Sequence, residues 1–437
     1  MKTIEQRLVE RFMRYSAISS QSNPLNIGKC LPTSPGQQEL AELIANELRA
    51  AGLDNVLCDE HATVTAVLRG TKKDCPTIGF IVHLDTVDVG LSPVVKAQLL
   101  RYEGGDVCLN KEKDIWLRAA EHPEIKCYAG QDILFSDGTS VLGADDKAAV
   151  SNVMEMITTL QQQRQDQKEE HGDVIICCVP DEEIGLLGAK NLDIQSRFNV
   201  DFAYTIDCCQ LGEVVFENFN AAKAEIIFTG VTAHPMSAKG VLVNPLLLAV
   251  DYISRFDRAE TPERTEGREG YIWFSDLRAH QSEAVLKVMV RDFDEAKFAA
   301  RVQQLHTAAE ALRSAHPTAR VAVKVEPQYR NIAAALAGEG GAAAVEVLRA
   351  AMRAAGVEPK ETPMRGGTDG AALAAHGLPT PNYFTGAHNF HSKFEFLPIP
   401  SFVKSYEVTR HIVFEAAKVQ RPKKESGHGG VKGCSRL

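Results

Sequence analysis

Hydrophobic and polar positions follow two different periods along this chain, and both are regular enough to predict elements. Apolar residues at three- and four-residue spacing predict helices, whereas short apolar and β-branched runs predict strands. The predicted helices in the first half are 4–18, 36–51 and 146–160. The predicted strands are Thr63–Leu68, Thr77–Val82, Asp173–Val179 and Ala203–Ile206. Strands that alternate with helices favour an α/β domain with a largely parallel sheet.

The order of elements changes after Asp207. The predicted strands there are Ala222–Phe228, Val285–Val290 and Arg320–Val325, and the predicted helices are 243–256 and 294–314. They supply three of the four strands and both helices of a β-α-β-β-α-β order, which is typical of a small sheet with two helices on one side. The first pattern then returns, with helices at 341–355 and 401–418 and an apolar turn at Leu378–Phe384.

These patterns predict one α/β domain that is interrupted by a smaller one. With 437 residues the chain is too long for a single ordinary core. We expect residues 1–218 and 331–418 to form the larger α/β domain and 219–330 to form an inserted α+β domain. The tail, 419–437, is rich in Gly, Lys and Ser and is expected to be disordered. The stretch 90–135 is irregular and rich in charge, and we assign nothing to it.

Charge and hydropathy narrow the function class. The net charge is −9, from 48 basic and 57 acidic residues, and no basic stripe appears in the folded part. That balance argues against nucleic acid as the partner. No apolar run approaches the roughly 20 residues that a membrane span needs. The N-terminus leads into an amphipathic helix rather than a secretory signal, so we expect the protein to fold inside a cell and not to be secreted.

Cysteine usage and the C-terminus bear on the compartment. The ten cysteines include the adjacent pairs Cys177-Cys178 and Cys208-Cys209, which point to opposite faces of a strand. Reduced thiols are therefore a better interpretation than disulfides or a tetrahedral zinc site. The chain ends in Ser435-Arg436-Leu437, one conservative change from the Ser-Lys-Leu peroxisomal address. The predicted location is cytoplasmic, or a peroxisome-like organelle if this tripeptide acts as a signal.

Two adjacent acids, Asp145 and Asp146, follow an apolar turn that contains Gly143. They repel each other, so placing both at one bend has a cost. Asp is a good helix N-cap, and acids in a first turn suit the helix dipole, so a helix start is one interpretation. A metal site is the other, and it depends on acids and histidines elsewhere in the chain.

Further candidate ligands follow other predicted strands. His83 and Asp85 lie two apart at a strand end and so face the same side, where a carboxylate can orient a ligating imidazole. The remaining candidates are the Asp181-Glu182-Glu183 run, Asp207, and His391 near the end of the folded chain. Taken alone, each candidate has a simpler explanation. His83 could form a hydrogen bond with Asp85 in a turn, and the three consecutive acids could form a solvated loop. Their common place at strand ends, where open α/β folds bind ligands, favours a shared site.

The donor types predict the metal. Imidazole nitrogens and carboxylates suit zinc, or manganese or cobalt, better than calcium. The candidates reduce to five ligands: His83, Asp145, one acid of the Glu182-Glu183 pair, Asp207 and His391. Five ligands are too many for one tetrahedral site, but they suit two metals that share one carboxylate.

At this point the motifs resemble those of a known family. The chain is similar to the peptidase T family of tripeptide aminopeptidases, within the co-catalytic di-zinc peptidases that include aminoacylases and carboxypeptidases. The matching segments are HLDT at 83–86, LGADDKA at 142–148, PDEEIG at 180–185, FENFNA at 216–221, HPMSAKGVLVNP at 234–245, RDFD at 291–294, RGGTDGA at 365–371 and PNYFTGAHNFHSKFEF at 381–396. The resemblance covers residues 8 to 418 and includes the inserted domain.

The resemblance implies a role for each matching residue. His83, Asp145 and Asp207 would bind one zinc, and Asp145, Glu183 and His391 would bind the other. Asp85 would orient His83, and Glu182 would be the general base and acid. The inserted domain would be a lid in which His234 stabilises the transition state. The substrate's backbone or carboxylate would contact Arg291 and Arg365.

The implied activity is metal-dependent hydrolysis of the N-terminal peptide bond of a tripeptide, by a monomer or by a homodimer that forms through the lid. The alternatives are a di-metal dipeptidase or N-acyl-amino-acid amidohydrolase, and a non-catalytic peptide-binding protein on the same scaffold. Two departures from the family pattern bear on substrate choice. Cys208-Cys209 follow Asp207 where the family is Gly-rich, and Phe394 stands where the family usually has a second His.

Overall fold

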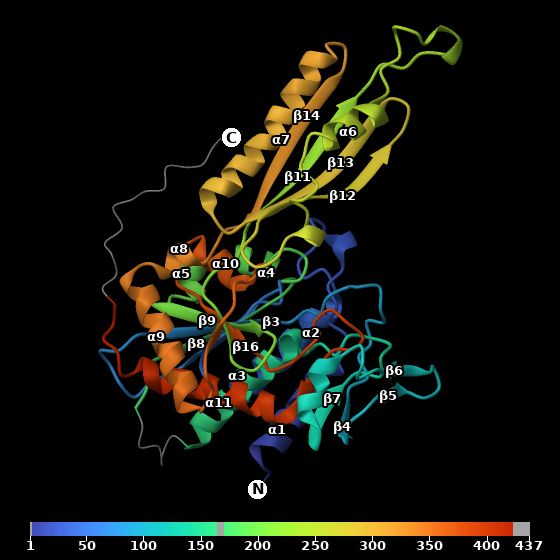
Figure 1. Cartoon of the computed structure of the whole chain (residues 1–437). Helices are drawn as coiled ribbons and strands as arrows, with labels where there is room; N and C mark the ends of the chain where they lie inside the picture. The colour runs from blue at the N-terminus through green and yellow to red at the C-terminus, as the bar shows by residue number, and fades with distance from the viewer. Residues whose placement is uncertain (1, 164–169, 423–437) are drawn as a thin grey trace. The chain divides into compact units, whose positions relative to one another are not determined.

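The computed structural model describes residues 2–163 and 170–422 (Figure 1). They group into two compact units. The larger contains the chain up to Val214, Ala335–Lys360 and the part from His376 onward, and the smaller contains Val215–Ala334 and Glu361–Ala375. The predicted fold class, an α/β domain interrupted by a smaller α+β one, is confirmed. The sequence did not show that 361–375 packs with the smaller unit. Ser435-Arg436-Leu437 lie outside the described residues.

The larger unit is built on an eight-stranded sheet with the order β1-β2-β8-β3-β9-β16-β10-β15. Its strands are β1 (Asp54–Cys58), β2 (Val64–Leu68), β3 (Ile78–His83), β8 (Val174–Val179), β9 (Phe202–Cys208), β10 (Glu213–Val215), β15 (Lys360–Glu361) and β16 (Asn382–Phe384). The centre is parallel, because β3 pairs in parallel with both β8 and β9, and β16 pairs in parallel with β9. β3 is buried along its whole length, as expected for a central strand covered on both faces.

In the described part of the larger unit, five long helices accompany this sheet. They are α1 (Ile4–Ser16), α2 (Pro35–Ala50), α3 (Ala144–Gln163), α9 (Glu339–Ala354) and α11 (Ile399–Ala416), and the short ones are α4 (Leu187–Asn191) and α5 (Ile194–Arg197). α3 contacts α1, α11 and the strands β3 and β9. It is buried over nearly all of its length, so the acidic bend at its start is fixed against the sheet.

The stretch 90–135, to which the sequence assigned nothing, folds into short strands. They are β4 (Gln98–Tyr102), β5 (Val107–Asn110), β6 (Ile115–Leu117) and β7 (Gln131–Phe135), with a 3₁₀ segment at Pro123–Tyr128. β7 pairs with β4 and also with β17 (Phe396–Pro398), far along the chain. These strands pack around a small apolar core that includes Leu117, Ile133 and Phe396. The pattern is weak here because each strand is short and half exposed.

The smaller unit is a four-stranded antiparallel sheet with the order β12-β13-β11-β14. Its strands are β11 (Asn220–Thr229), β12 (Tyr271–Ala279), β13 (Glu283–Asp292) and β14 (Arg320–Tyr329); its helices are α6 (Pro245–Ile253), α7 (Glu295–Ala315) and α10 (Asp369–Ala374), and α8 (Ala333–Leu336) follows β14. The strands and helices α6 and α7 follow the predicted β-α-β-β-α-β order. Ile226, Leu286 and Leu305 belong to the core that β11, β13 and α7 share.

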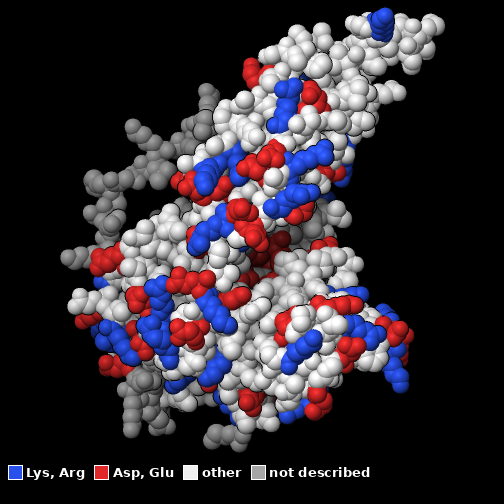
Figure 2. All heavy atoms as spheres, viewed as in Figure 1, with Lys and Arg blue, Asp and Glu red and all other residues white. Residues whose placement is uncertain are grey.

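The surface agrees with the charge balance of the sequence. Figure 2 shows acidic and basic side chains interspersed over the face in view, with no continuous basic stripe among the described residues there. Within the described ranges, every helix is too short or too polar to cross a lipid bilayer.

Candidate metal centre

The parallel strands bring the predicted ligands to one edge of the large sheet. His83 is the last residue of β3, Glu182 and Glu183 follow β8, and Asp207 lies at the end of β9. His391 comes from the loop between β16 and β17, and Asp145 lies in the first turn of α3. The carboxyl ends of parallel strands are where open α/β sheets place their ligands.

Asp145 stands between two histidines. Its Oδ1 lies 3.0 Å from Nε2 of His83, and its Oδ2 lies 3.0 Å from Nε2 of His391. The side chain is buried. Burial opposes ionisation, but the hydrogen bonds from His391 and His83 hold the pKa of Asp145 well below its usual range. The carboxylate is therefore ionised and offers one oxygen to each imidazole.

His391 also meets Glu183. Nε2 of His391 lies 3.0 Å from Oε1 of Glu183. Burial and the charge of Asp145 raise the pKa of Glu183 to about 7. Burial lowers the pKa of His391, but hydrogen bonds with Asp145 and Glu183 outweigh it and raise that pKa to about 11. In the absence of a cation, the imidazolium of His391 balances these carboxylates.

Among the described residues, three groups of side chains have the spacing of metal ligands, with all the ligand atoms of a group within 4.8 Å of one another. They are His83 with Asp145 and Asp146; His83 with Glu182 and Asp207; and Asp145 with Glu183 and His391. The last is the predicted ligand set for the second metal. The set predicted for the first metal is divided between the other two groups, which share His83. A cluster of imidazoles and buried carboxylates fits divalent ions such as zinc.

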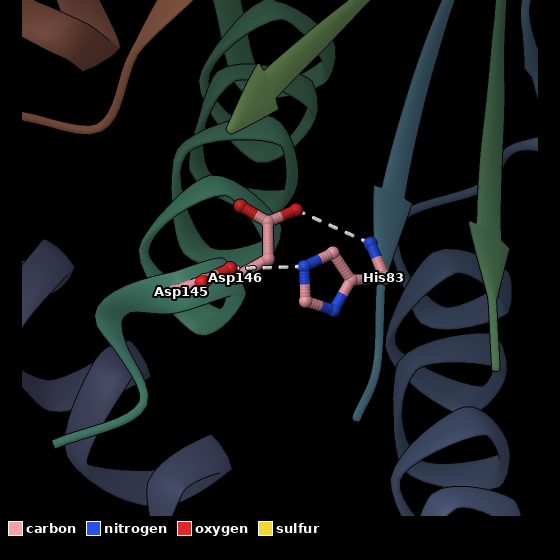
Figure 3. Close-up of side chains that lie close together, drawn as sticks. All are labelled: His83, Asp145 and Asp146. Carbon is pink, nitrogen blue, oxygen red and sulfur yellow. Dashed lines mark hydrogen bonds and ion pairs between the residues drawn. The ribbon is translucent and has the colours of Figure 1, made fainter. Parts of the chain in front are cut away.

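The Asp146 side chain points away from Asp145 and accepts a backbone hydrogen bond. Its Oδ2 accepts the N–H of His83 at 3.2 Å, so it joins the start of α3 to the end of β3 (Figure 3). Burial raises the pKa of Asp146 well above its usual range. The peptide bond between Asp145 and Asp146 is cis. The preceding Gly143 has φ of +74°, and a Cβ there would lie 2.9 Å from Cγ2 of Thr86, so the bend requires glycine.

Asp85 contacts His83 and also the acidic loop after β8. Nδ1 of His83 lies 3.1 Å from the Asp85 carbonyl oxygen and 3.4 Å from its Oδ1. The same carboxylate accepts the backbone N–H groups of Glu182, at 2.9 Å, and Glu183, at 3.2 Å. Asp85 thus fixes one imidazole and the loop with two candidate functional acids. The second of these contacts was not apparent from the sequence.

Asp181 anchors the other side of that loop. Its carboxylate accepts from the backbone N–H of Thr33 at 2.7 Å and from the Gln37 side chain at 2.7 Å. The Asp181 N–H donates to the side chain of Gln37 in return. The run of three acids predicted a functional loop, but no sequence signal connected Asp181 with the start of α2.

Lys147 is a further buried charge near the centre. It is fully buried in α3, and its Nζ donates to the carbonyl of Ile18 at 3.0 Å. Burial lowers the pKa of Lys147 to about 8, against the charges of Asp85 and Glu395. A cation beneath a cluster of acids offsets part of their mutual repulsion.

The two departures from the family pattern, Cys208-Cys209 and Phe394, are buried or half-buried side chains. Burial raises the pKa of the Cys208 and Cys209 thiols, which favours neutral thiols over thiolates. The Phe394 ring lies 4.8 Å from the ring of His122, measured between centroids, and packs against the core around β4–β7. The place of the family's second His is thus taken by an apolar contact.

The predicted substrate contacts lie in the smaller unit. Nδ1 of His234 accepts the N–H of Met236 at 3.2 Å, and Arg291 lies over the ring of Tyr329. The guanidinium of Arg365 lies over the rings of Phe219 and Tyr271 and donates to Thr265, Gly267 and Glu269. Arg365 therefore already holds a loop of its own unit. Its role toward a substrate stays a prediction, as do those of Arg291 and His234.

Comparison with known proteins gives a consistent result. The family model for "Peptidase family M20/M25/M40" matches residues 142–415. A Peptidase T-like protein of Rhizobium meliloti (strain 1021) is 56% identical over 414 residues, which cover 95% of this chain and 99% of that protein. The Peptidase T of Caldanaerobacter subterraneus subsp. tengcongensis is 40% identical over 409 residues, with 93% and 98% covered. The crystal structure of the aminopeptidase PepT from Bacillus cereus ATCC 10987 matches with a TM-score of 0.74 at 23% identity, with 95% and 99% covered, which shows a shared fold.

Proposed function

Because this chain belongs to the peptidase M20/M25/M40 family, we propose that it is a metal-dependent aminopeptidase that releases the N-terminal residue of tripeptides. The observation that carries the proposal is the position of Asp145, whose two carboxylate oxygens each face the Nε2 atom of a different histidine. A carboxylate so placed is suited to bridge two metal ions.

We assign the ligands as follows. His83, Asp145 and Asp207 would hold one ion, and Asp145, Glu183 and His391 would hold the other. Zinc is the proposed metal, with manganese or cobalt as alternatives, since imidazole and carboxylate donors suit all three. Metal ions held by these residues would lower the pKa of a water toward about 7 and polarise the carbonyl of the scissile bond.

The chain's own residues supply the proton transfers. Glu182 accepts a proton from the attacking water and then delivers a proton to the leaving amine, which is general base and acid catalysis by one carboxylate. Asp85 positions Glu182 through its backbone N–H and fixes the ring of His83. In the smaller unit, which would act as a lid, His234 would stabilise the oxyanion, an interaction worth about 10²–10³ in rate. Arg291 and Arg365 would bind the backbone or carboxylate of the peptide.

The second candidate function keeps the same chemistry and changes the substrate to a dipeptide or an N-acyl amino acid. Cys209 favours it, because this half-buried side chain lies within electrostatic reach of Asp145 and Asp207. A side chain at this place narrows the space available to the substrate amine. The relative with 56% identity is moreover described as Peptidase T-like rather than as Peptidase T.

A substrate panel tests the proposal. The zinc-loaded protein is assayed against tripeptides, dipeptides and N-acyl amino acids, and kcat/KM is compared. Tripeptides should be preferred; a preference for either other class would replace the first proposal with the second.

Glu182→Gln tests the mechanism and separates catalysis from mere peptide binding. It should lower kcat by about 10²–10⁴ while the protein still binds two zinc ions. Full activity in this variant would show that Glu182 is not the base, and no activity in the wild type would favour a peptide-binding protein.

The proposed location is cytoplasmic, and the proposed assembly is a monomer or a homodimer through the smaller unit. A fluorescent reporter that ends in Ser-Arg-Leu, imaged beside one without this tripeptide, tests whether Ser435–Leu437 is an organelle address. Sedimentation of the zinc-loaded protein measures its assembly.

A further inference from the structure

A buried carboxylate that is not a predicted ligand holds the bend that carries Asp145. Glu395 is 1% exposed. Its Oε2 accepts the backbone N–H groups of Leu142 and Gly143, both at 2.8 Å, and its Oε1 accepts the N–H of Asp145 at 3.2 Å. One side chain thus satisfies three backbone donors of the turn that leads into α3.

This arrangement costs free energy unless the contacts compensate it. Burial and the charge of Asp145 both oppose ionisation of Glu395 and raise its pKa, whereas the three N–H donors favour the ionised form. Buried carboxylates persist where several hydrogen bonds satisfy their lone pairs. An apolar residue would avoid this desolvation, but it would leave three N–H groups of the bend without their acceptor. The carboxylate therefore orders the bend, and its burial has a desolvation cost that an apolar residue would not have.

Glu395 belongs to the loop that supplies His391. Within this loop, the Glu395 N–H donates to the carbonyl of Ser392, the residue after His391, at 3.1 Å. The loop is closed by two backbone hydrogen bonds between His388 and Phe396, at 2.9 and 3.2 Å. His391 therefore faces Oδ2 of Asp145 from the same short loop whose Glu395 fixes the Asp145 backbone.

We propose that Glu395 is a positioning residue that locks the Asp145 bend to the His391 loop and so sets the affinity of the proposed two-metal centre. Without this contact, the Asp145 backbone can rotate, and its two oxygens no longer face His83 and His391 together. The inference rests on the proposed function, because it assumes that Asp145 shares its oxygens between two metals.

Glu395→Gln tests the proposal with little change in volume. Glutamine offers one oxygen in place of two. If that oxygen accepts from Leu142 and Gly143, the amide nitrogen faces the N–H of Asp145, and two donors oppose each other. Zinc affinity, measured by competition with a chromogenic chelator, should fall by about 10–100-fold, as is usual when a residue that supports a ligand is lost. The zinc concentration for half-maximal activity should rise in proportion.

Glu155→Gln is the matched control. Glu155 is also about 1% exposed and lies in α3, but it pairs with Arg7 and Arg11 on α1 rather than with the bend. This variant should lose thermal stability and keep wild-type zinc affinity. If its affinity falls as far as that of Glu395→Gln at equal loss of stability, the role of Glu395 is structural only, and the proposal is wrong.

Glu395→Asp adds a milder change, since it keeps the charge and both oxygens but shortens the side chain. Its zinc affinity should lie between those of wild type and Glu395→Gln. Should both variants fail to fold, hydrogen exchange in the zinc-free wild type decides. The amides of Leu142, Gly143 and Asp145 should open together and exchange more slowly than those of the exposed turn at Gly104 and Gly105. Exchange at the rate of that turn overturns the proposal.

The wild type separates the two levels of inference. If it binds fewer than two metal ions, the proposed function fails. If it binds two and Glu395→Gln binds them as tightly, only the positioning role of Glu395 fails.

Discussion

Asp145 and Asp146 are chemically identical neighbours with different partners. Asp145 faces two imidazoles with its two oxygens, whereas Asp146 turns to the backbone N–H of His83. An acid that shares its charge between two cations cannot be replaced by an amide, because the amide has one acceptor and no charge. An acid whose contact is a single backbone N–H can be replaced.

Substitution by asparagine should therefore separate them. Asp145→Asn should lower zinc content from two ions per chain to less than one, since both proposed sites lose a ligand. Asp146→Asn keeps an oxygen for the N–H of His83 and should keep close to two ions. Elemental analysis of dialysed protein measures both. Equal zinc loss in the two variants would contradict the division of roles.

The sequence shows candidate ligands better than it shows the residues that hold them. His83, Asp145, Glu183 and His391 come together because parallel strands end at one edge, which the position of each after an apolar run predicts. Glu395 acts through backbone N–H groups about 250 residues away, and its partners are set by the fold alone. The sequence predicted reduced thiols at Cys208-Cys209, and burial together with nearby carboxylates raises the pKa of both thiols.

At the scale of elements, β3 connects the core to the site, since it ends in His83. Its Gly79 pairs with Ile175 of β8 and Ala203 of β9. A Cβ at this position would lie 2.3 Å from Cζ of the buried Phe198. The ring and the strand must therefore fit without a side chain at Gly79.

Gly79→Ala should destabilise the larger unit by about 1–3 kcal/mol, the usual cost of overpacking a core. The midpoint of urea unfolding measures this change. Gly340→Ala is the control, because a Cβ there meets nothing closer than 3.6 Å, in helix α9. It should leave stability unchanged or raise it by up to about 1 kcal/mol. If Gly340→Ala lowers the free energy of unfolding more than Gly79→Ala does, the structure relaxes around the Phe198 contact at little cost in stability.

Helices and strands were predictable where the pattern of their own residues determines their secondary structure. The central strands and the helices α3, α7 and α11 carry long runs with a clear period, and each lies close to its predicted range. The short strands β4–β7 do not, because their pairing includes β17, more than 250 residues along the chain. A strand of three to five half-exposed residues has too few positions for alternation to show.

At the scale of the whole molecule, the candidate metal centre connects stability to pH. Without a cation, protons must neutralise the clustered acids. Burial and the charge of Asp145 raise the pKa of Glu183 from 4.5 to about 7. Ion pairs with Asp145 and Glu183 outweigh burial and raise the pKa of His391 from 6.5 to about 11.

The direction of the effect follows from proton binding. A group with a higher pKa in the folded chain holds its proton more tightly there, so it favours folding at low pH and loses that contribution as pH rises. Between pH 5 and 7.5, Glu183 and His391 both act in this direction. The lowered pKa of Asp145 acts oppositely, but only at more acidic pH. The zinc-free protein should therefore become less stable as pH rises through this window.

Zinc should reverse this trend, because it takes the place of the protons and binds more tightly once its ligands are deprotonated. At a free zinc concentration 100 times Kd, binding adds about 3 kcal/mol to the stability of the folded chain. We expect the melting temperature of the EDTA-treated protein to fall from pH 5 to pH 7.5 and that of the zinc-loaded protein to stay level or rise. Scanning calorimetry across this range measures both.

Glu183→Gln removes one of the titrating groups, so its zinc-free melting temperature should depend less on pH than that of the wild type. A gap between loaded and zinc-free protein that stays constant with pH would mean that these side chains do not exchange protons for metal, and the assignment of the ligands would be wrong.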